Sequence, residues 1–439
     1  MDLRGFLEVV RKAGEIHEIR REVDPVRELG AVLNACERGG KAAFFHRVKD
    51  FDIPVTGALL SSSRRIALAL ACFESEVRAR MAAATEEPVK YELRKGRAPC
   101  QEVVIEAPDL AQLPIPTHSP LDAGPFITAG VIIARDPESG RHNLSYNRMQ
   151  IYGADRAGIS MNIWRHIKGF FDKIEPQGRN LPFCVALGAD PVVMMAAAFR
   201  YAGDEYDVAG SLRGAPIPVA SALTCDVLVP ASAEIILEGE VLAGERQMEG
   251  PMAEFTGHYS GADPKHVARI TRITHRANPI FQTMNGGGYE HVSIGNMITR
   301  EPLLERFVKH ISPRVKAVHL PPYSGGFTAL VALENPEPGE ARNVALAAMA
   351  AHVNFKTVIV VDADVDIYDP ADVMWALSTR ARWDRGFSAV PGAHTNELDP
   401  SSDEHGIVAK AIIDATLPAE KRKRYLKVAY PAVDLKSYL

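Results

Sequence analysis

Two glutamates stand on either side of a Gly-Pro dipeptide in the segment MEGPMAEFTGHYS, residues 248–260. Because Gly250-Pro251 prevents a helix from continuing through it, we expect Glu249 and Glu254 to flank a turn. In such a pair one carboxylate can stay ionised beside an arginine, while burial or a like charge raises the pKa of the other. The segment is therefore a candidate for general acid–base chemistry, although two solvated turn glutamates with a capping role would also fit.

A second polar segment is HNLSYNRMQ, residues 142–150, which the alternation of its side chains predicts to be a strand. Alternation puts on one face Asn143, Ser145 and Asn147, and on the other Leu144, Tyr146 and Arg148. Polar residues thus occur on both faces, which is compatible with a polar site. A surface hairpin with one wet face would give the same pattern.

Three further segments carry possible ligands. NIWRHIKGF, residues 162–170, places Arg165 and His166 at the start of a predicted helix, and AGDEYDVAG, residues 202–210, holds an acidic cluster. VIVVDADVDIYD, residues 358–369, ends a buried strand with alternating aspartates, a pattern that suits a metal as well as capping. A packed histidine and a solvated acidic loop are the commoner explanations of the first two.

The bulk composition narrows the function classes. A length of 439 residues suggests two or three domains, and the net charge of −5 offers neither a nucleic-acid footprint nor a polybasic membrane patch. No apolar run approaches the ~20 residues of a membrane span. Five scattered cysteines without a CxxC pair predict reduced thiols in a cytoplasmic setting. The sequence contains no GxxxxGK[ST], HExxH or GxSxG motif and no dinucleotide fingerprint.

The predicted elements divide the chain into five parts. We expect helices over 2–13, 27–38 and 63–83, a mostly β middle with a hairpin around PESGRH, and alternating strands and helices after about Glu301. Asp369-Pro370 predicts a helix start. The predicted parts are an N-terminal α/β segment (1–95), a β-rich domain (96–300), a connecting helix (301–314), a C-terminal α/β domain (315–405) and a helical tail (406–439).

The order of these segments over residues 95 to 385 resembles the UbiD family of prenylated-flavin-dependent decarboxylases. The residues that carry the resemblance are NLSYNR, the RH before IKGF, the GDE before YDVAG, EGPMAE, and VDADVDIYDPADVMWALSTR. The chain departs from the family pattern at Met252 and Ala253, where Phe-Gly is often found, and the Tyr146-Asn147 pair also varies among relatives.

The resemblance implies a set of cofactor ligands. Asn143, His166 and Glu205 would bind a divalent metal, usually manganese, that bridges to the phosphate of prenylated FMN. The remaining cofactor contacts that it implies are Tyr146, Asn147, Arg148, Arg165 and Lys356, with Arg165 and Lys356 at the phosphate. A potassium ion would lie near residues 195–200.

The resemblance also implies a catalytic set of Arg148, Glu249 and Glu254. Arg148 would hold the substrate carboxylate and keep Glu249 ionised, whereas Glu254, with a pKa raised toward neutrality, would deliver the proton. The expected reaction is reversible non-oxidative decarboxylation of an aromatic, heteroaromatic or α,β-unsaturated acid, with the modified flavin as electron acceptor. His291, Met252 and Ile163 are candidates for lining the substrate pocket.

The fold implied by the family is a flavin-reductase-like split β-barrel domain joined by a helix to a C-terminal α/β (βαβ) oligomerisation domain, in the α+β or α/β class. The expected partners are a carboxylic acid, CO2, a flavin prenyltransferase that supplies the cofactor, and further copies of the chain as a dimer or hexamer. Neither nucleic acid nor membrane insertion is expected. The alternatives are a plain flavin-binding oxidoreductase with a split barrel, a non-catalytic relative, and, with less support, a metal-dependent hydrolase.

Overall fold

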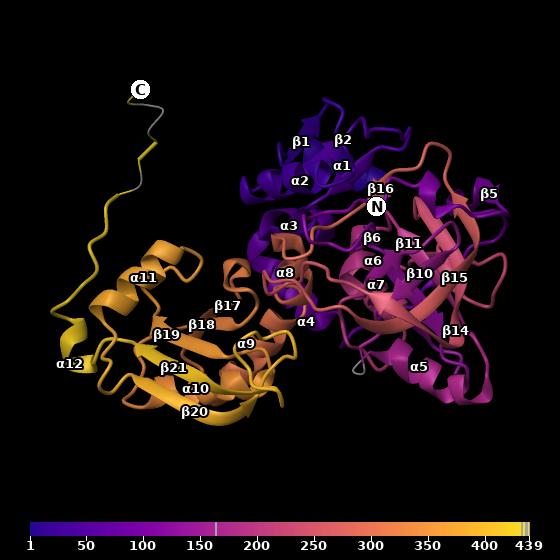
Figure 1. The fold of residues 1–439 in the computed structure, drawn as a ribbon. Coiled ribbons are helices and arrows are strands. Elements are labelled where there is room, and N and C mark those ends of the chain that lie inside the picture. The colour runs from indigo at the N-terminus through magenta and orange to yellow at the C-terminus, as the bar shows by residue number, and fades with distance from the viewer. Residues whose placement is uncertain (163–164, 432, 435–437, 439) are drawn as a thin grey trace. The chain divides into compact units, whose positions relative to one another are not determined.

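The fold is described from a computed structural model that covers residues 1–162, 165–431, 433–434 and 438. The chain divides into two units, Met1–Pro302 and Leu303–Leu439, and helix α9 (Arg300–Ile311) crosses the division. Figure 1 shows the helices and strands of each unit.

The main sheet of the first unit curls strongly into a half-barrel, which agrees with the predicted split barrel. Its strands, in spatial order, are β6 (Phe126–Ile127), β9 (Met149–Ile151), β10 (Arg156–Ile159), β15 (Asp263–His275), β14 (Ile235–Glu249), β11 (Leu181–Leu187), β7 (Val131–Arg135) and β8 (His142–Tyr146). Strand β5 (Val103–Ile105) also pairs with β15. The long antiparallel strands β14 and β15 lie side by side (Figure 1).

Both faces of this sheet are buried. Along β7, Val131 and Ile133 pack into one hydrophobic cluster, whereas Ile132 and Ala134 pack into another. Helices cover both faces, which explains why the β7 sequence is an apolar run rather than an alternation. The helices of this unit are α1 (Leu3–Lys12), α2 (Glu28–Arg38), α3 (Ser63–Leu70), α4 (Val77–Ala83), α5 (His166–Ile174), α6 (Pro191–Ala196), α7 (Glu205–Arg213) and α8 (Tyr289–Gly295).

Two smaller sheets complete the first unit. One contains β1 (Ile16–Ile19), β2 (Ala42–Phe45), β3 (Val55–Gly57) and β16 (Phe281–Gln282), and the other contains β13 (Leu228–Pro230), β12 (Pro218–Ser221) and β4 (Glu92–Leu93). The predicted helix over 63–83 is interrupted, because Ala71 adopts a left-handed conformation with φ of 52° and ends α3 there. The predicted hairpin is present, since β7 and β8 pair across the PESGRH turn.

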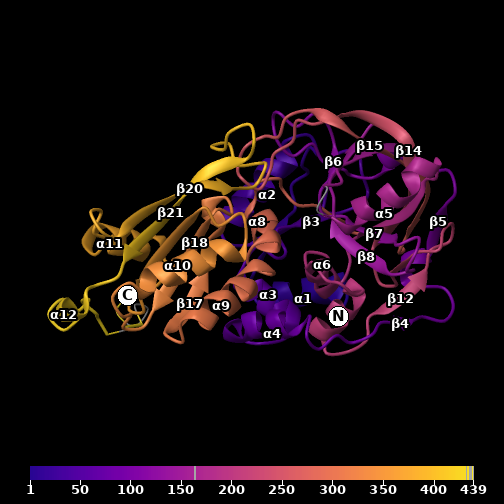
Figure 2. The same cartoon turned by 90° about the horizontal axis from the view of Figure 1, so that it is seen from below.

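The second unit is an α/β sheet, as the alternating pattern predicts. Its strands, in spatial order, are β17 (Val315–His319), β18 (Thr328–Leu333), β19 (Thr357–Asp362), β21 (Ile407–Ala415) and β20 (Phe387–His394). The pairs β18–β19 and β19–β21 are parallel. Helices α9 and α10 (Glu340–Ala351) share a core with one face of the sheet, and α11 (Pro370–Thr379) packs on the other (Figure 2).

Two details of this unit bear on the predictions. Asp369 caps α11 through a bond from the Ala371 amide at 2.9 Å, with Pro370 as the first helical residue, as expected. The prediction of a helical tail from residue 406 is wrong over Ile407–Ala415, which forms strand β21. Only the short helix α12 (Ala419–Arg422) is found in the described part of the remaining tail.

Candidate active site

The three predicted metal ligands converge at one end of the main sheet. Asn143 lies on the terminal strand β8, His166 is the first residue of α5, and Glu205 is the first residue of α7. Helix α5 packs into the hydrophobic cluster on one face of the sheet and α7 into the cluster on the other face. The sheet thus ends near two helix N-termini, and the first turn of each helix carries one of the predicted ligands.

The distances within this group are short. The Asn143 side-chain amide donates to Glu205 Oε1 at 3.1 Å and lies 3.5 Å from His166 Nδ1. His166 Nδ1 and Glu205 Oε1 are 3.8 Å apart, and the backbone amide of Leu144 donates to Glu205 Oε2 at 3.0 Å. Burial raises the pKa of the Glu205 carboxyl, while the neighbouring His166 ring and the hydrogen bond from the Leu144 amide act in the opposite direction.

One buried atom indicates that this group is incomplete. The Asn143 Oδ1 atom is buried and has no hydrogen-bond partner among the described residues. A buried carbonyl oxygen without a partner is costly, and a cation would satisfy it. Two oxygen donors and one imidazole suit a hard or borderline divalent ion. The described residues contain no group of three His, Cys, Asp or Glu that could hold a metal, and the candidate set differs by including an amide.

Arg148 lies between the two glutamates of the EGPMAE segment. Its Nε and Nη2 atoms donate to Glu249 Oε1 and Oε2, both at 2.7 Å, and Nη1 donates to Glu254 Oε1. Glu249 is fully buried at the end of β14, and Glu254 is nearly so. These contacts join residues 101 and 106 positions apart in the chain. Burial lowers the pKa of Arg148. The hydrogen bonds with Glu249 and Glu254 and the negative charges of these two residues outweigh burial, so the pKa is raised overall.

The predicted strand through residues 142–150 is broken at this point. Strand β8 ends at Tyr146 and β9 begins at Met149, so Asn147 and Arg148 lie between two strands that pair with different neighbours. Asn147 donates to Ser145 Oγ at 2.9 Å, and the Tyr146 hydroxyl donates to the Met194 carbonyl at 3.1 Å. At this break the Arg148 carbonyl still accepts a bond from the Ser160 amide at 3.2 Å, and the Arg148 side chain reaches Glu249.

Backbone amides anchor the loop that carries Glu254. The Gly250 amide donates to Gln150 Oε1 at 2.8 Å, and the Ala253 amide donates to Asp122 Oδ1 at 2.9 Å. The Glu254 amide donates to the His258 carbonyl at 2.8 Å. Neither Gln150 nor Asp122 is predictable as a support from the sequence, because an isolated polar residue in a strand or loop gives no signal of a distant partner.

Positive charge gathers beside the metal ligands. Arg165 precedes His166 and has no side-chain partner among the described residues. Burial and the charge of Arg165 lower the pKa of Arg300 to about 10. The predicted phosphate contact Lys356 belongs to the second unit, where its Nζ donates to Asp399 at 2.9 Å, and its role stays a prediction.

Two of the three candidate pocket residues, His291 and Met252, lie in the described part of the chain. His291 lies on α8 with its ring centroid 6.1 Å from that of Phe255, and burial lowers its pKa, while Glu254, Arg148 and Arg165 are close enough to affect it. Met252 is buried in the Glu254 loop. Ile163 lies outside the described residues.

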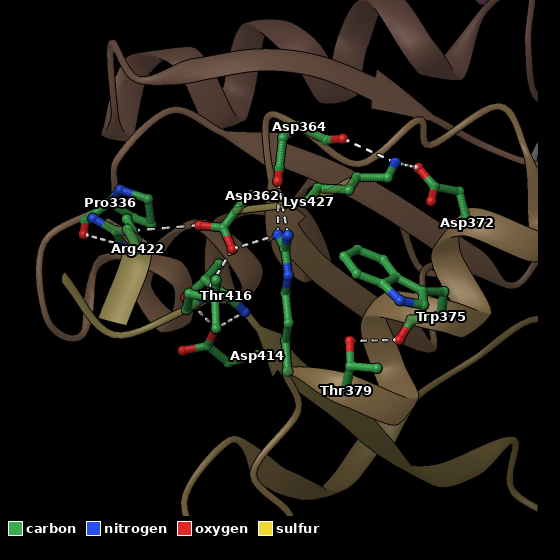
Figure 3. Close-up of polar contacts among 12 residues, drawn as sticks. Pro336, Asp362, Asp364, Asp372, Trp375, Thr379, Asp414, Thr416, Arg422 and Lys427 are labelled. Atoms are coloured by element: carbon green, nitrogen blue, oxygen red, sulfur yellow. Dashed lines mark hydrogen bonds and ion pairs between the residues drawn. The ribbon is translucent and has the colours of Figure 1, made fainter. Parts of the chain in front are cut away.

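The aspartates after β19 form ion pairs within the protein. Arg380 donates to both oxygens of Asp364 at 2.7 Å and to Asp362 at 3.0 Å. Figure 3 shows Asp362 and Asp364 together with Arg422 and Lys427, which also contact this group. Of the two interpretations of this aspartate segment, a metal site or internal hydrogen bonding, the structure supports internal hydrogen bonding.

Comparisons with known proteins agree over the whole chain. Three domain descriptions match in order: the 3-octaprenyl-4-hydroxybenzoate carboxy-lyase N-terminal domain at residues 7–85, the Rift-related domain at 91–289 and the C-terminal domain at 294–415.

In the described residues no helix is both long and apolar enough to cross a bilayer.

Individual relatives are decarboxylases of different acids. Anhydromevalonate phosphate decarboxylase of Methanothermobacter thermautotrophicus is 32% identical, with 97% of this chain and 99% of that protein covered. Gallate decarboxylase of Lactiplantibacillus plantarum is 30% identical over 100% of this chain and 99% of its own.

A solved enzyme has the same fold. The UbiD-class enzyme HmfF from Pelotomaculum thermopropionicum, in complex with FMN, is 38% identical with a TM-score of 0.95 over 100% of both chains. An evolved dimeric form of HmfF in complex with prFMN gives a TM-score of 0.90 at 36% identity, again over 100% of both chains. The three matched domains, the shared fold and these relatives show that the chain belongs to the UbiD family and is a decarboxylase, a carboxy-lyase, of that family.

Proposed function

We propose that this protein catalyses the reversible, non-oxidative decarboxylation of an aromatic, heteroaromatic or α,β-unsaturated carboxylic acid with prenylated FMN. The observation that carries the proposal is the buried contact of Arg148 with both Glu249 and Glu254. The flavin complexes of the similar HmfF structures support the cofactor. When bound, the prenylated flavin supplies an electron acceptor for the bond that breaks.

Arg148 suits the task of binding the substrate carboxylate. A guanidinium has five N–H donors in a fixed plane, and Glu249 and Glu254 take three of them. One N–H on each terminal nitrogen remains for a ligand. Since the bidentate contact with Glu249 fixes the orientation of the guanidinium, these two donors point in a defined direction.

Glu254 is the better candidate for the proton carrier. Both oxygens of Glu249 accept bonds from Arg148, so that carboxylate is held as an acceptor. Glu254 uses only Oε1 in this way, and its Oε2 atom has no partner among the described residues. A carboxyl with one free oxygen, held by the same arginine, can hold a proton and deliver it to the carbon that has lost CO2.

The metal and phosphate contacts complete the proposal. Asn143, His166 and Glu205 would hold Mn2+, whose charge attracts the cofactor phosphate, with Arg165 as a further contact. Helices α5 and α7 both begin at this point, so their N-terminal amides and dipoles also favour an anion. We further propose the potassium ion near residues 195–200, a role for Lys356 at the phosphate, a homodimer or hexamer, and supply of the cofactor by a flavin prenyltransferase.

The test of this proposal compares Glu254→Gln with wild type after loading with prenylated FMN and Mn2+. Glutamine keeps the shape and the Arg148 contact but cannot deliver a carboxyl proton, so we expect a loss of at least about 100-fold in CO2 release. Bound flavin and metal should equal those of wild type. Turnover at the wild-type rate would refute the proton-donor role of Glu254, whereas a loaded wild-type protein that released no CO2 from any acid would favour the plain flavoenzyme or non-catalytic alternatives.

A further inference from the structure

Cys184 and Cys225 are 41 positions apart in the chain, and their sulfur atoms lie 3.8 Å from each other. Cys184 is fully buried in the middle of β11, whereas Cys225 lies in the turn between β12 and β13 and is only partly buried. The two sulfurs are thus in direct contact, one inside the protein and one near its surface. A disulfide bond of about 2.05 Å would require them to approach by less than about 2 Å.

The turn that carries Cys225 is fixed beside Cys184. Glu238 on β14 is the residue paired with Cys184 across the β11–β14 ladder. The Glu238 carboxylate accepts bonds from the backbone amides of Leu223 at 2.9 Å and Thr224 at 2.7 Å. The strand next to Cys184 therefore positions the residues that precede Cys225, so the contact between the sulfurs is built into the fold.

The two thiols differ in acidity. The hydrogen bond with Cys184 lowers the pKa of the Cys225 thiol, although burial acts in the opposite direction. Burial raises the pKa of Cys184 well above the usual value. A more acidic, more accessible thiol next to a buried one is the arrangement in which the first reacts and the second resolves.

We propose that Cys184 and Cys225 form a redox-active dithiol that hydrogen peroxide oxidises to a disulfide. The Cys225 thiolate attacks the peroxide oxygen, breaking the O–O bond, and forms a sulfenic acid with release of water. The Cys184 sulfur then attacks the Cys225 sulfur, the S–S bond forms, and the sulfenic hydroxyl leaves as a second water. A dithiol reductant reverses the change by thiol–disulfide exchange.

Closure of the disulfide would act on the site described above, a consequence that rests on the proposed metal ligands. The Leu228 amide, three residues after Cys225, donates to His142 Nε2 at 3.1 Å, and the Tyr206 hydroxyl donates to the Leu228 carbonyl at 2.9 Å. His142 and Tyr206 are the chain neighbours of Asn143 and Glu205. Movement of Cys225 toward Cys184 thus strains the supports of two ligands, and we expect Mn2+ to bind about tenfold more weakly.

The test uses the full-length protein without flavin, reduced and then exposed to hydrogen peroxide. Intact mass and peptide mapping should show loss of two hydrogens and a Cys184–Cys225 cross-link that dithiothreitol removes. Cys225→Ser should form no cross-link. Cys100→Ala is the matched control, because Cys100 is a buried neighbour whose pKa burial raises to about 12, and this variant should behave as wild type. Absence of the cross-link, or a cross-link through Cys100, would overturn the proposal.

Titration with Mn2+ separates the disulfide from its consequence. The oxidised wild-type protein should bind Mn2+ about tenfold more weakly than the reduced protein, and dithiothreitol should restore the affinity. Peroxide should leave the affinity of Cys225→Ser unchanged. Equal affinities in a cross-linked sample would remove the link to the metal site. If the reduced protein failed to bind Mn2+ at all, the proposed function would be refuted and the disulfide would stand on the mass measurement.

Discussion

Gly286 offers a way to move the Glu254 loop without changing any charged residue. A Cβ atom at position 286 would lie 2.1 Å from the Ala253 carbonyl oxygen and 2.8 Å from the Ala253 carbonyl carbon. Real Cβ contacts are essentially never shorter than 3.0 Å, so the Ala253–Glu254 peptide must move by at least about 0.9 Å. The obstacle is backbone, which no side-chain rotation can relieve.

In Gly286→Ala, therefore, Glu254 should shift relative to Arg148 while Asn143, His166 and Glu205 stay in place. A misplacement of about 1 Å can cost about 100-fold in rate, and we expect kcat/KM for decarboxylation to fall by that factor. Mn2+ and flavin content should be unchanged. The assay is CO2 release under single-turnover conditions, with the bound cofactor measured in the same sample.

Gly295→Ala on α8 is the matched control, because a Cβ there would meet nothing within 4 Å. This variant should keep wild-type activity and a wild-type or slightly higher Tm, since alanine is the better helix former. Thermal unfolding of Gly286→Ala separates a shifted loop from a misfolded protein. A Gly286→Ala protein with a normal Tm and wild-type kcat/KM would refute the reasoning that the position of this loop governs proton delivery.

Two further predictions concern the metal and the pH dependence of stability. Asn143→Ala should bind Mn2+ at least about tenfold more weakly in calorimetric titrations. Asn143→Asp keeps an oxygen at that position and should retain binding. An equal loss of affinity in both variants would contradict an oxygen ligand at residue 143. Burial raises the pKa of Glu290 from 4.5 to about 8. The folded protein therefore holds a proton there that the unfolded chain releases, and the free energy of unfolding should fall as the pH rises from about 5 to 8, by on the order of 4 kcal/mol. Glu290→Gln keeps the acceptor for the Leu60 amide and should remove most of this dependence in urea titrations at pH 5 and pH 8. If wild type and variant lost stability in parallel, Glu290 would not be the source.

The elements that sequence patterns predicted well are those whose local signal agrees with their final environment. Leu3, Phe6, Leu7 and Val10 recur at helical spacing, and all four are buried on α1. The VIVV run of β19 is buried on both faces, so its continuous apolar character corresponds to a central parallel strand. Asp369 caps its helix as its type and position predicted.

The elements that were missed have misleading local signals. Strand β14 was not recognised, because register shifts after Glu238 and Val241 interrupt its alternation. Strand β21, IVAKAIIDA, is rich in alanine and has apolar residues at spacings that also suit a helix, and its parallel pairing with β19 overrides that preference. The helix breaks at Ala71, which adopts a left-handed conformation. Such a conformation is usually signalled by a glycine, and this position holds an alanine.

The candidate site shows the same division. The residue types of Glu249 and Glu254 suggest acid–base chemistry, whereas Arg148 joins them only through the family resemblance, because its contacts with them span about a hundred positions and no local pattern encodes such a distance. It was the order of several motifs, rather than any one of them, that indicated convergence. The supports Asp122 and Gln150 and the neighbouring cation Arg300 were found only in the structure.

The EGPMAE loop is anchored through its main chain rather than through its two central side chains. Main-chain groups make the bonds that hold it, among them the amides of Gly250, Met252, Ala253 and Glu254, and among the described residues the side chains at 252 and 253 contribute none of these bonds. Substitution at these two positions can therefore reshape the neighbourhood of Glu254 while leaving the bonds that hold it intact. For protein engineering, the two central residues of this hexapeptide are the ones to randomise first, with replacements of similar volume at the buried Met252.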